Sequence, residues 1–233
     1  MKALDIEALA DDAWLLRLDD RLDEGLNARV HALAARIAAN APDWLRDVVP
    51  AYASLAVFFE PRLVPASQVH AWLRRLVAVA GDDPPATAGR RVEIPMVYGG
   101  EYGPDLAAAA DELGITPEQL AALHAGSDYT VAMIGFAPGF PYLFGLDPAL
   151  ALPRLATPRV RVPAGSVGVA GGQTGIYPRE SPGGWRVLGR TPLRLFDPGG
   201  EPPSVLQPGD RVRFIAIDAA EYAALSAPTE HGG

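Results

Sequence analysis

Three polar residues stand close together in a glycine-rich stretch in the second half of the chain. Gln173, Thr174 and Tyr177 lie in the sequence G-G-Q-T-G-I-Y-P, which begins at residue 171. The glycines allow a backbone to approach a ligand closely, and the amide, hydroxyl and phenol offer directional hydrogen bonds. Such side chains suit an amide or lactam substrate. The glycines could equally mark bulges and corners of a β-barrel, so both interpretations stay open.

Two arginines precede this stretch with the alternating spacing of a β-strand. Arg159 and Arg161 alternate with valines, so both are expected on one face of a strand. Two guanidinium groups beside a glycine loop would form a clamp for an anion, and a solvent-facing strand is the alternative. Residues 92–153 carry eight acids and no Arg or Lys, whereas residues 154–213 carry nine Arg against four acids. This imbalance predicts either an Arg-lined cleft or two mutually attracting faces of one domain.

His124 is the histidine best placed for chemistry. It lies one turn from Leu120, near the carboxyl end of a predicted helix, where a protonated imidazole is favoured. It is therefore a candidate general acid or anion ligand, and the alternative is a buried histidine bonded to a backbone carbonyl. The four histidines lack the spacing of metal ligands, so we expect no metal site. Ser166 is not expected to be a nucleophile, because its surroundings do not match G-x-S-x-G.

Aromatic residues gather in G-F-A-P-G-F-P-Y-L-F, which begins at residue 135. They could wall a binding pocket or simply belong to the core. We therefore name two sets of candidates. The candidate catalytic residues are His124, Arg161 and Gln173, and the candidate substrate-binding residues are Phe136, Tyr142, Thr174 and Tyr177.

Composition excludes several classes of function. The 233 residues carry a net charge of −8, which argues against nucleic acid and anionic membrane as partners. The sequence has no cysteine, and Lys2 is its only lysine, so thiolate, P-loop and Schiff-base chemistry are excluded on this chain. The amino-terminal residues show no signal peptide, and no apolar run is long enough to span a membrane, so we expect a cytoplasmic protein.

The first 88 residues are predicted to form a small α+β domain. A strand is expected over residues 14–18, then a helix whose apolar stripe runs from Leu26 to Ile37. Two strands over residues 47–52 and 55–59 and a helix over residues 65–79 follow. The predicted order is thus β-α-β-β-α. Residues 81–89 have the composition of a linker, and residues 92–98 could close this sheet or open the next domain.

Residues 89–233 are predicted to form a second domain that is mainly β. Two short helices come first: Pro104 is placed at the start of one, and Thr116 and Gln119 form a capping box at the start of the other. Strands are then expected over residues 129–136, 159–162, 185–188, 193–196 and 211–217, separated by turn signals. Short extended segments of this kind are typical of an antiparallel barrel or sandwich.

Several long motifs resemble those of one protein family. They are I-P-M-V-Y-G-G from residue 94, L-H at 123–124, G-F-A-P-G-F-P-Y-L from 135, V-P-A-G-S-V-G-V-A-G-G-Q-T-G-I-Y-P from 162, S-P-G-G-W from 181 and L-F-D-P from 195. Together they resemble the KipI / allophanate hydrolase subunit 1 family from about residue 12 to residue 217. The resemblance implies an α+β N-terminal domain followed by a mainly antiparallel β, cyclophilin-like barrel domain.

The same resemblance implies an activity and partners. Bacterial members include a subunit of an ATP-dependent 5-oxoprolinase, which converts 5-oxo-L-proline, ATP and water to L-glutamate, ADP and phosphate. The implied partners are a KipA/PxpC-type subunit with a homologous barrel and a LamB/YcsF/PxpA-type subunit. ATP would be a co-substrate of the complex, with Mg on a partner subunit and no cofactor held by this chain alone. We expect a small lactam or amide as substrate, bound in a composite site shared with the KipA-type subunit.

Two other functions stay open from the sequence. Some relatives inhibit a sensor histidine kinase, and nothing in the barrel motifs argues against that role. The chain could also be the amide-binding part of a urea carboxylase or allophanate hydrolase system. That role requires a biotin carboxylase partner, and this chain lacks the biotin-attachment pattern with its modified lysine.

Overall fold

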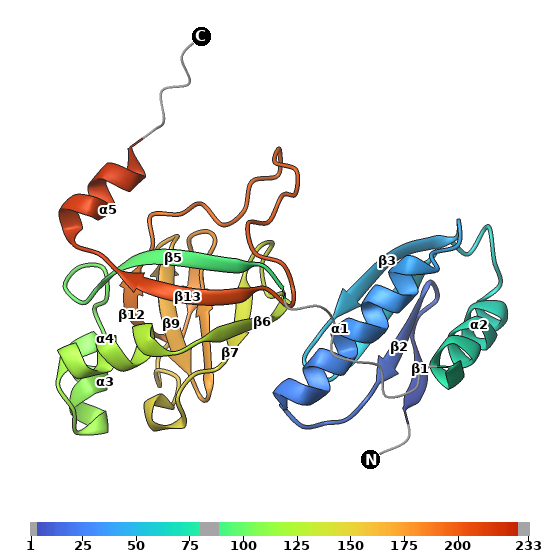
Figure 1. The fold of residues 1–233 in the computed structure, drawn as a ribbon, viewed down its shortest axis with the longest axis horizontal. Coiled ribbons are helices and arrows are strands. Elements are labelled where there is room, and N and C mark those ends of the chain that lie inside the picture. The colour runs from blue at the N-terminus through green and yellow to red at the C-terminus, as the bar shows by residue number, and fades with distance from the viewer. Residues whose placement is uncertain (1–3, 80–88, 228–233) are drawn as a thin grey trace, which may run out of the picture. The chain divides into compact units, whose positions relative to one another are not determined.

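The computed structural model describes residues 4–79 and 89–227, which divide into two compact units, Met1–Gly89 and Arg90–Gly233 (Figure 1). Most of the predicted linker over residues 81–89 lies outside the described residues. None of the helices in the described part of the chain is both long and apolar enough to cross a membrane.

The first unit is a sheet covered on one face by two helices. Its sheet is antiparallel, in the order β1-β2-β4-β3. Helices and sheet share one core, in which alternate residues of β4, Leu55, Val57 and Phe59, meet Val30 and Leu73 of the helices. The elements are β1 (Asp5–Ala10), β2 (Ala13–Arg17), α1 (Glu24–Ala39), β3 (Leu45–Pro50), β4 (Ser54–Phe59) and α2 (Ala66–Val79).

Most of this unit follows the sequence prediction. The stripe from Leu26 to Ile37 is buried as expected, and the Asp23 carboxylate caps α1 by accepting a hydrogen bond from the Leu26 N–H at 2.7 Å. The predicted order β-α-β-β-α was wrong in one respect, because β1 precedes it. This strand lies at the edge of the sheet with most of its residues partly or fully exposed, so it lacks the alternation that identifies a half-buried strand.

The second unit is a closed seven-stranded barrel in the order β10-β7-β6-β13-β5-β12-β9, with β9 returning to β10. Neighbouring strands are antiparallel except β5 and β13, which run parallel, so the expected mainly antiparallel barrel is confirmed. Residues 92–98 belong to this wall, because β5 pairs with both β12 and β13. The wall strands are β5 (Arg91–Tyr98), β6 (Tyr129–Ile134), β7 (Pro141–Phe144), β9 (Ser166–Ala170), β10 (Gln173–Ile176), β12 (Arg186–Arg190) and β13 (Arg211–Ala216).

The remaining elements lie outside the barrel wall. Helices α3 (Leu106–Leu113) and α4 (Pro117–Gly126) lie side by side against the barrel (Figure 1). The predicted capping box is confirmed, since Thr116 and Gln119 bond each other's backbone N–H. Strands β8 (Arg159–Val162) and β11 (Ser181–Gly183) form a two-stranded ribbon. A short 3-10 turn, η1 (Pro148–Leu150), and helix α5 (Ala219–Ser226) complete the unit.

Two predicted details of this unit were wrong. Helix α3 begins at Leu106 rather than at Pro104, because the Asp105 backbone and carboxylate bond to β12 and to Arg159 instead of capping the helix. Residues 193–196 form no strand; Phe196 makes only an isolated bridge to Ser204. The sequence also missed β7, β9, β10 and β11, whose glycines and prolines resemble turn signals.

Asp105 ties the ribbon to the barrel. Its buried carboxylate accepts two hydrogen bonds from the Arg159 guanidinium, at 2.8 and 2.5 Å, and a third from the Val187 N–H at 2.7 Å. Removing one partner of such a pair leaves a partly buried charge and a buried N–H without partners. We therefore expect this contact to contribute strongly to stability.

Replacing Asp105 tests this expectation. Asp105→Ala should lower the free energy of unfolding by about 3 kcal/mol or more, and Asp105→Asn by less, because an amide oxygen can still accept the Val187 N–H bond. Urea unfolding followed by circular dichroism measures both. Glu180→Ala is the matched control, because Glu180 forms an exposed ion pair with Arg161, which lies on the same strand as Arg159. Equal losses in the Asp105 and Glu180 variants would contradict the expectation.

Candidate functional site

The barrel wall separates the candidate residues into an inner and an outer set. Successive residues of a strand point to opposite faces. One cluster of buried hydrophobic residues has members on all seven strands, so it is the interior of the barrel. On β10, Ile176 belongs to this interior, and Thr174 shares its face. Gln173 and Tyr177 therefore lie on the outer face, as does Tyr142, which is paired with Gly175 of β10.

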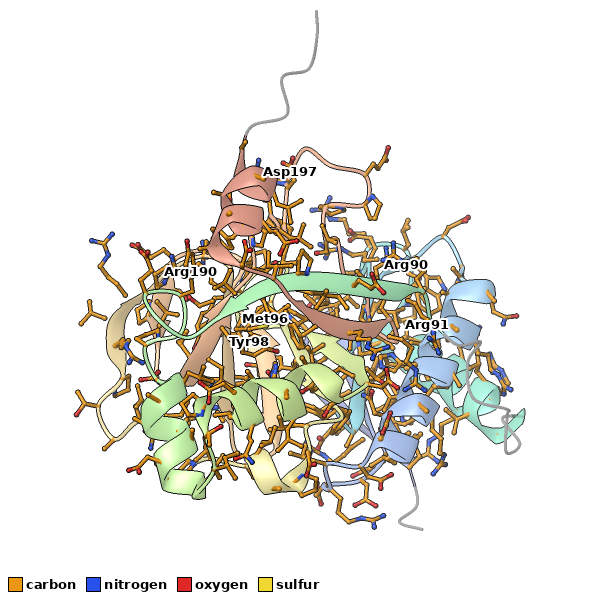
Figure 2. All side chains as sticks on the ribbon, turned by 60° about the vertical axis from the view of Figure 1, so that its left-hand side comes forward. Arg90, Arg91, Met96, Tyr98, Arg190 and Asp197 are labelled. Carbon is orange, nitrogen blue, oxygen red and sulfur yellow. The ribbon has the colours of Figure 1, made fainter. Side chains whose placement is uncertain are left out.

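His124 lies inside the barrel at the centre of a buried network. It is fully buried between the rings of Tyr129 and Phe214, at centroid distances of 5.4 and 4.7 Å. Its Nδ1 lies 2.7 Å from the Tyr98 hydroxyl, and its Nε2 lies 3.1 Å from the Thr174 Oγ1. Met96 and Tyr98 of β5, both labelled in Figure 2, pack in this core. His124 is thus bonded to side-chain hydroxyls, not to a backbone carbonyl.

The network fixes the direction of each hydrogen bond. Thr174 donates its hydroxyl proton to the Gly168 carbonyl at 3.0 Å, so its oxygen is left to accept from His124. The imidazole therefore carries its proton on Nε2, and Nδ1 accepts from the Tyr98 hydroxyl. Burial lowers the pKa of His124 to about 3 and raises the pKa of Tyr98. The imidazole is neutral at physiological pH and positions Thr174 and the β9 backbone.

The outer set forms an aromatic cluster, which we call the aromatic surface and define by Phe136, Phe140, Tyr142, Tyr177 and Trp185. Phe140, Tyr177 and Trp185 are buried in it, so Phe136 and part of Tyr142 are the rings that a ligand can reach. The Phe140 ring stands at its centre and contacts the other four rings at centroid distances between 4.9 and 5.7 Å. Burial raises the pKa of both tyrosines, so both hydroxyls stay protonated at neutral pH. Three of the four predicted substrate-binding residues meet here, and Thr174 does not.

Phe136 is displayed by a strained turn. Its φ is 65°, the only positive φ at a non-glycine residue in the described part of the chain. The Ala137 N–H donates to the Gly135 carbonyl at 2.7 Å across it, which makes a γ-turn of the rare, strained kind. The ring is 64% exposed although it is large and apolar. Strain of this kind is retained where a side chain must be held in a particular place, so Phe136 stays a candidate contact for a ligand or partner.

Glycine permits the close packing beneath this surface. A Cβ placed on Gly183 would lie 2.3 Å from the Tyr177 hydroxyl oxygen and under 3 Å from two atoms of its ring. The ribbon strand β11 therefore passes directly against Tyr177. Any side chain at this position would move the phenol.

The predicted anion clamp of Arg159 and Arg161 is not formed. Both bonds of the Arg159 guanidinium go to Asp105, and the Arg161 guanidinium makes two bonds of 2.9 Å to Glu180. The alternative of mutually attracting charges accounts for Arg159, whose partner Asp105 lies in the acidic stretch, and the alternative of a solvent-facing strand accounts for Arg161. Arg161 is thus paired on the exposed ribbon, whereas His124 lies inside the barrel, so these two of the three predicted catalytic residues are not brought together.

Arg154 is the cation that the sequence reasoning missed. It is exposed and, within residues 4–79 and 89–227, makes neither a hydrogen bond nor an ion pair. Its segment runs beside the aromatic surface, because the Leu155 N–H donates to the Gly184 carbonyl at 2.7 Å. Its positive charge acts on the Tyr142 and Tyr177 phenols, opposing the rise in pKa that burial causes. No local pattern distinguishes this arginine in the sequence; only the fold brings it here.

The aromatic surface and Arg154 can together bind a small, partly apolar anion. Phe136 and Tyr142 offer apolar area, Gln173 lies on the same outer face, and the guanidinium can bind a carboxylate through two parallel hydrogen bonds. Among the described residues, no three His, Asp or Glu side chains are grouped so that they could hold a metal ion.

Comparison with known proteins identifies the family. Residues 4–206 match the family model described as carboxyltransferase domain, subdomain C and D. A Bacillus subtilis (strain 168) protein named as a subunit of 5-oxoprolinase is 41% identical over 227 residues, which cover 93% of this chain and 94% of that protein.

Solved structures share the fold. The crystal structure of TTHA0988 superposes with a TM-score of 0.77 at 42% identity, over 89% of this chain; the match spans only 40% of that longer chain. The urea amidolyase of K. lactis superposes with a TM-score of 0.76 over 94% of this chain and 15% of its own. At 18% identity, this second likeness concerns the fold alone.

The buried His124 predicts a pH dependence of stability. Unfolding returns its pKa from about 3 to the ordinary value of 6.5, so between these values the unfolded chain binds more protons than the folded protein. The contribution of His124 is complete above pH 6.5 and is lost as the pH falls. We expect a loss of about 2 kcal/mol between pH 8 and pH 5. The loss should be absent in His124→Gln when both proteins are unfolded with urea at each pH. A parallel pH dependence in the two proteins would exclude this origin.

The strained turn predicts a difference between two substitutions that both remove the Phe136 ring. Glycine adopts a positive φ without steric cost, whereas alanine keeps the strain. Phe136→Gly should therefore be more stable than Phe136→Ala by about 1 kcal/mol. Thermal and urea unfolding of the pair measure the difference, and a less stable glycine variant would show that the turn is unstrained.

Proposed function

The chain belongs to the family of the carboxyltransferase domain, subdomain C and D, and from this premise we propose that it is a subunit of an ATP-dependent 5-oxoprolinase complex. The complex would convert 5-oxo-L-proline, ATP and water to L-glutamate, ADP and phosphate. The observation that carries the proposal is the 41% identity to a 5-oxoprolinase subunit across nearly the whole of both chains. The designation of that relative as a subunit supports partner subunits, for which we propose the KipA/PxpC and LamB/YcsF/PxpA types.

The aromatic surface fits the chemistry of 5-oxo-L-proline. This molecule combines a small apolar ring, a lactam and a carboxylate. We place the ring on Phe136 and Tyr142, the lactam amide toward Gln173 and the carboxylate on Arg154. These contacts position the substrate; they do not activate it.

Activation of the lactam is assigned to the complex. A lactam resists attack by water, and phosphorylation of its oxygen would make the carbonyl carbon electrophilic. This step requires ATP and a cation that neutralises the phosphates. The sequence contains no P-loop lysine, so we place ATP and its Mg²⁺ on a partner subunit. His124 and Thr174 would act from inside the wall as positioning residues, and Arg161 would hold the ribbon through Glu180.

Arg154→Ala tests the placement of the carboxylate. A contact made equally in the ground state and the transition state affects KM rather than kcat. Loss of a bidentate carboxylate contact should raise KM for 5-oxo-L-proline about tenfold or more while kcat changes little. The measurement is ATP-dependent glutamate release by the reconstituted complex. Arg213→Ala is the matched control, because Arg213 is also an exposed arginine but lies on β13.

Two results would count against the proposal. Glutamate release that is the same with and without this chain would remove it from the complex. An unchanged KM in Arg154→Ala, together with normal activity, would remove Arg154 from the substrate site while leaving the subunit role intact.

A further inference from the structure

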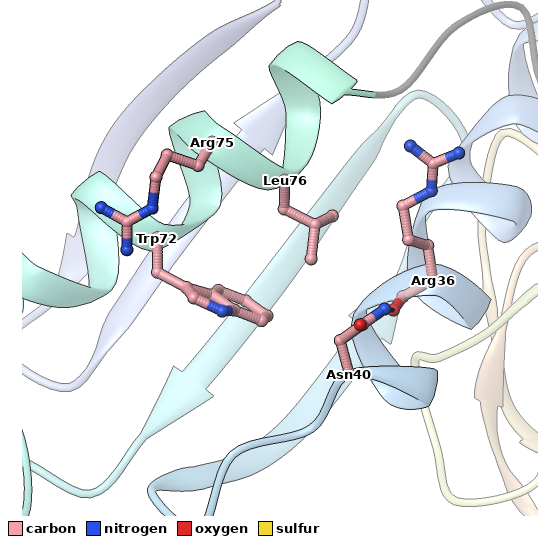
Figure 3. A pocket seen from close by; sticks show the side chains of 5 residues that line it. All are labelled: Arg36, Asn40, Trp72, Arg75 and Leu76. Atoms are coloured by element: carbon pink, nitrogen blue, oxygen red, sulfur yellow. Dashed lines mark hydrogen bonds between the residues drawn. The ribbon is translucent and has the colours of Figure 1, made fainter.

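The first unit contains a cavity that the proposed function does not use. It has a volume of about 410 Å³ and lies between α1 and α2. Figure 3 shows Trp72 and Leu76 of α2 extending toward Arg36 and Asn40 at the end of α1, with the Arg75 guanidinium directed to the other side of Trp72. Small-molecule sites in proteins have volumes of about 300 to 1,000 Å³, so the cavity is large enough for a ligand.

The indole of Trp72 is a preorganised wall of this cavity. The Trp44 ring packs edge-on against it at a centroid distance of 5.2 Å and an angle of 85°. A second hollow of about 340 Å³ is lined by Trp44, Trp72 and Arg75, among others. Trp72 is nevertheless only half-buried. A rigid indole that borders two open spaces offers apolar surface on which a planar group can stack.

The charge of the cavity is positive. The Arg75 guanidinium has no ion pair or hydrogen bond to any residue in the described ranges, and Arg36 supplies a second guanidinium across the cavity (Figure 3). Among the described residues, no acidic side chain lines either hollow. The carboxyl end of α1 at Asn40 carries a partial negative charge, which Arg36 in the last turn offsets.

The neighbouring Arg74 differs in its contacts. Its Nε donates to the His70 Nε2 at 3.4 Å, on the part of α2 where His70 packs against Trp14. Arg74 lines neither hollow. Of these two adjacent arginines, Arg75 is the one available to a ligand in the cavity.

We propose that this cavity binds a small molecule that carries both a planar ring and an anionic group, either a carboxylate or a phosphate. The ring would stack on Trp72, and the anion would accept the parallel hydrogen bonds of the Arg75 guanidinium. Nucleoside phosphates and aromatic carboxylates both have this chemistry, and the experiment distinguishes them.

Isothermal titration calorimetry with the full chain tests the proposal with four probes. ADP and benzoate each carry a ring and an anionic group, whereas adenosine carries only the ring and inorganic phosphate only the anionic group. We expect ADP or benzoate to bind at least about tenfold more tightly than either half-probe. Binding of ADP alone identifies a nucleoside phosphate site, and binding of benzoate alone identifies an aromatic carboxylate site.

Variants tie the binding to this cavity. Arg75→Ala should weaken binding of the tighter probe about tenfold or more, and Arg75→Lys should restore part of it. Trp72→Leu should weaken it as well, with circular dichroism confirming that the variant folds. Arg74→Ala is the matched control and should bind like the unmodified chain.

Three results would overturn the proposal. The first is the absence of binding by both ADP and benzoate up to about 10 mM. The second is that inorganic phosphate binds as tightly as ADP and benzoate, which would show that a ring stacked on Trp72 adds nothing to binding. The third is an effect of Arg74→Ala equal to that of Arg75→Ala, or no effect of either.

Discussion

The parallel pairing of β13 with β5 closes the barrel, and closure leaves each wall residue facing either inward or outward. Thr174 faces inward and holds the His124 network, while the residues on either side of it face outward. Because the register is pinned by hydrogen bonds on both edges of β10, a slip of one residue would expose Ile176 and bury Gln173. The inner network and the aromatic surface are therefore two faces of the same strands.

Charge pairing decides which groups are left for a ligand. The second unit uses Asp105 and Glu180 to hold Arg159 and Arg161, and these pairs fasten the ribbon that packs against Tyr177. Arg154 lies in the segment that this arrangement brings beside the aromatic surface. Two pairs, Arg159 with Asp105 and Arg186 with Glu112, join the arginine-rich stretch to the acidic one, whereas Arg154 makes no ion pair with any described residue.

The sequence predicted the elements whose signals are local. The buried stripe of α1, the capping box of α4 and the alternation in β4 depend on residues within a few positions of each other, and each was found as predicted. The motifs also carried the family resemblance and the expectation of a barrel. Strands β9 and β10 were not predicted, because their glycines resemble turn signals but here permit close packing of neighbouring strands. The same gap explains why the two sets of candidate residues were not separated: Gln173 and Thr174 face opposite sides because they lie on β10, a strand that the sequence analysis did not predict.

The exposed ring of Phe136 suits a surface that a partner subunit covers in a complex. On the proposed function, a phosphorylated lactam forms near the rings, and such an intermediate must be shielded from untimely attack by water. A ring that is 64% exposed at a strained φ gives no such shielding by itself. A partner subunit that covers Phe136 would exclude water and bury apolar area, and the second contribution would offset the strain of the turn. The strain is then explained by the assembled state, in which this side chain would be covered.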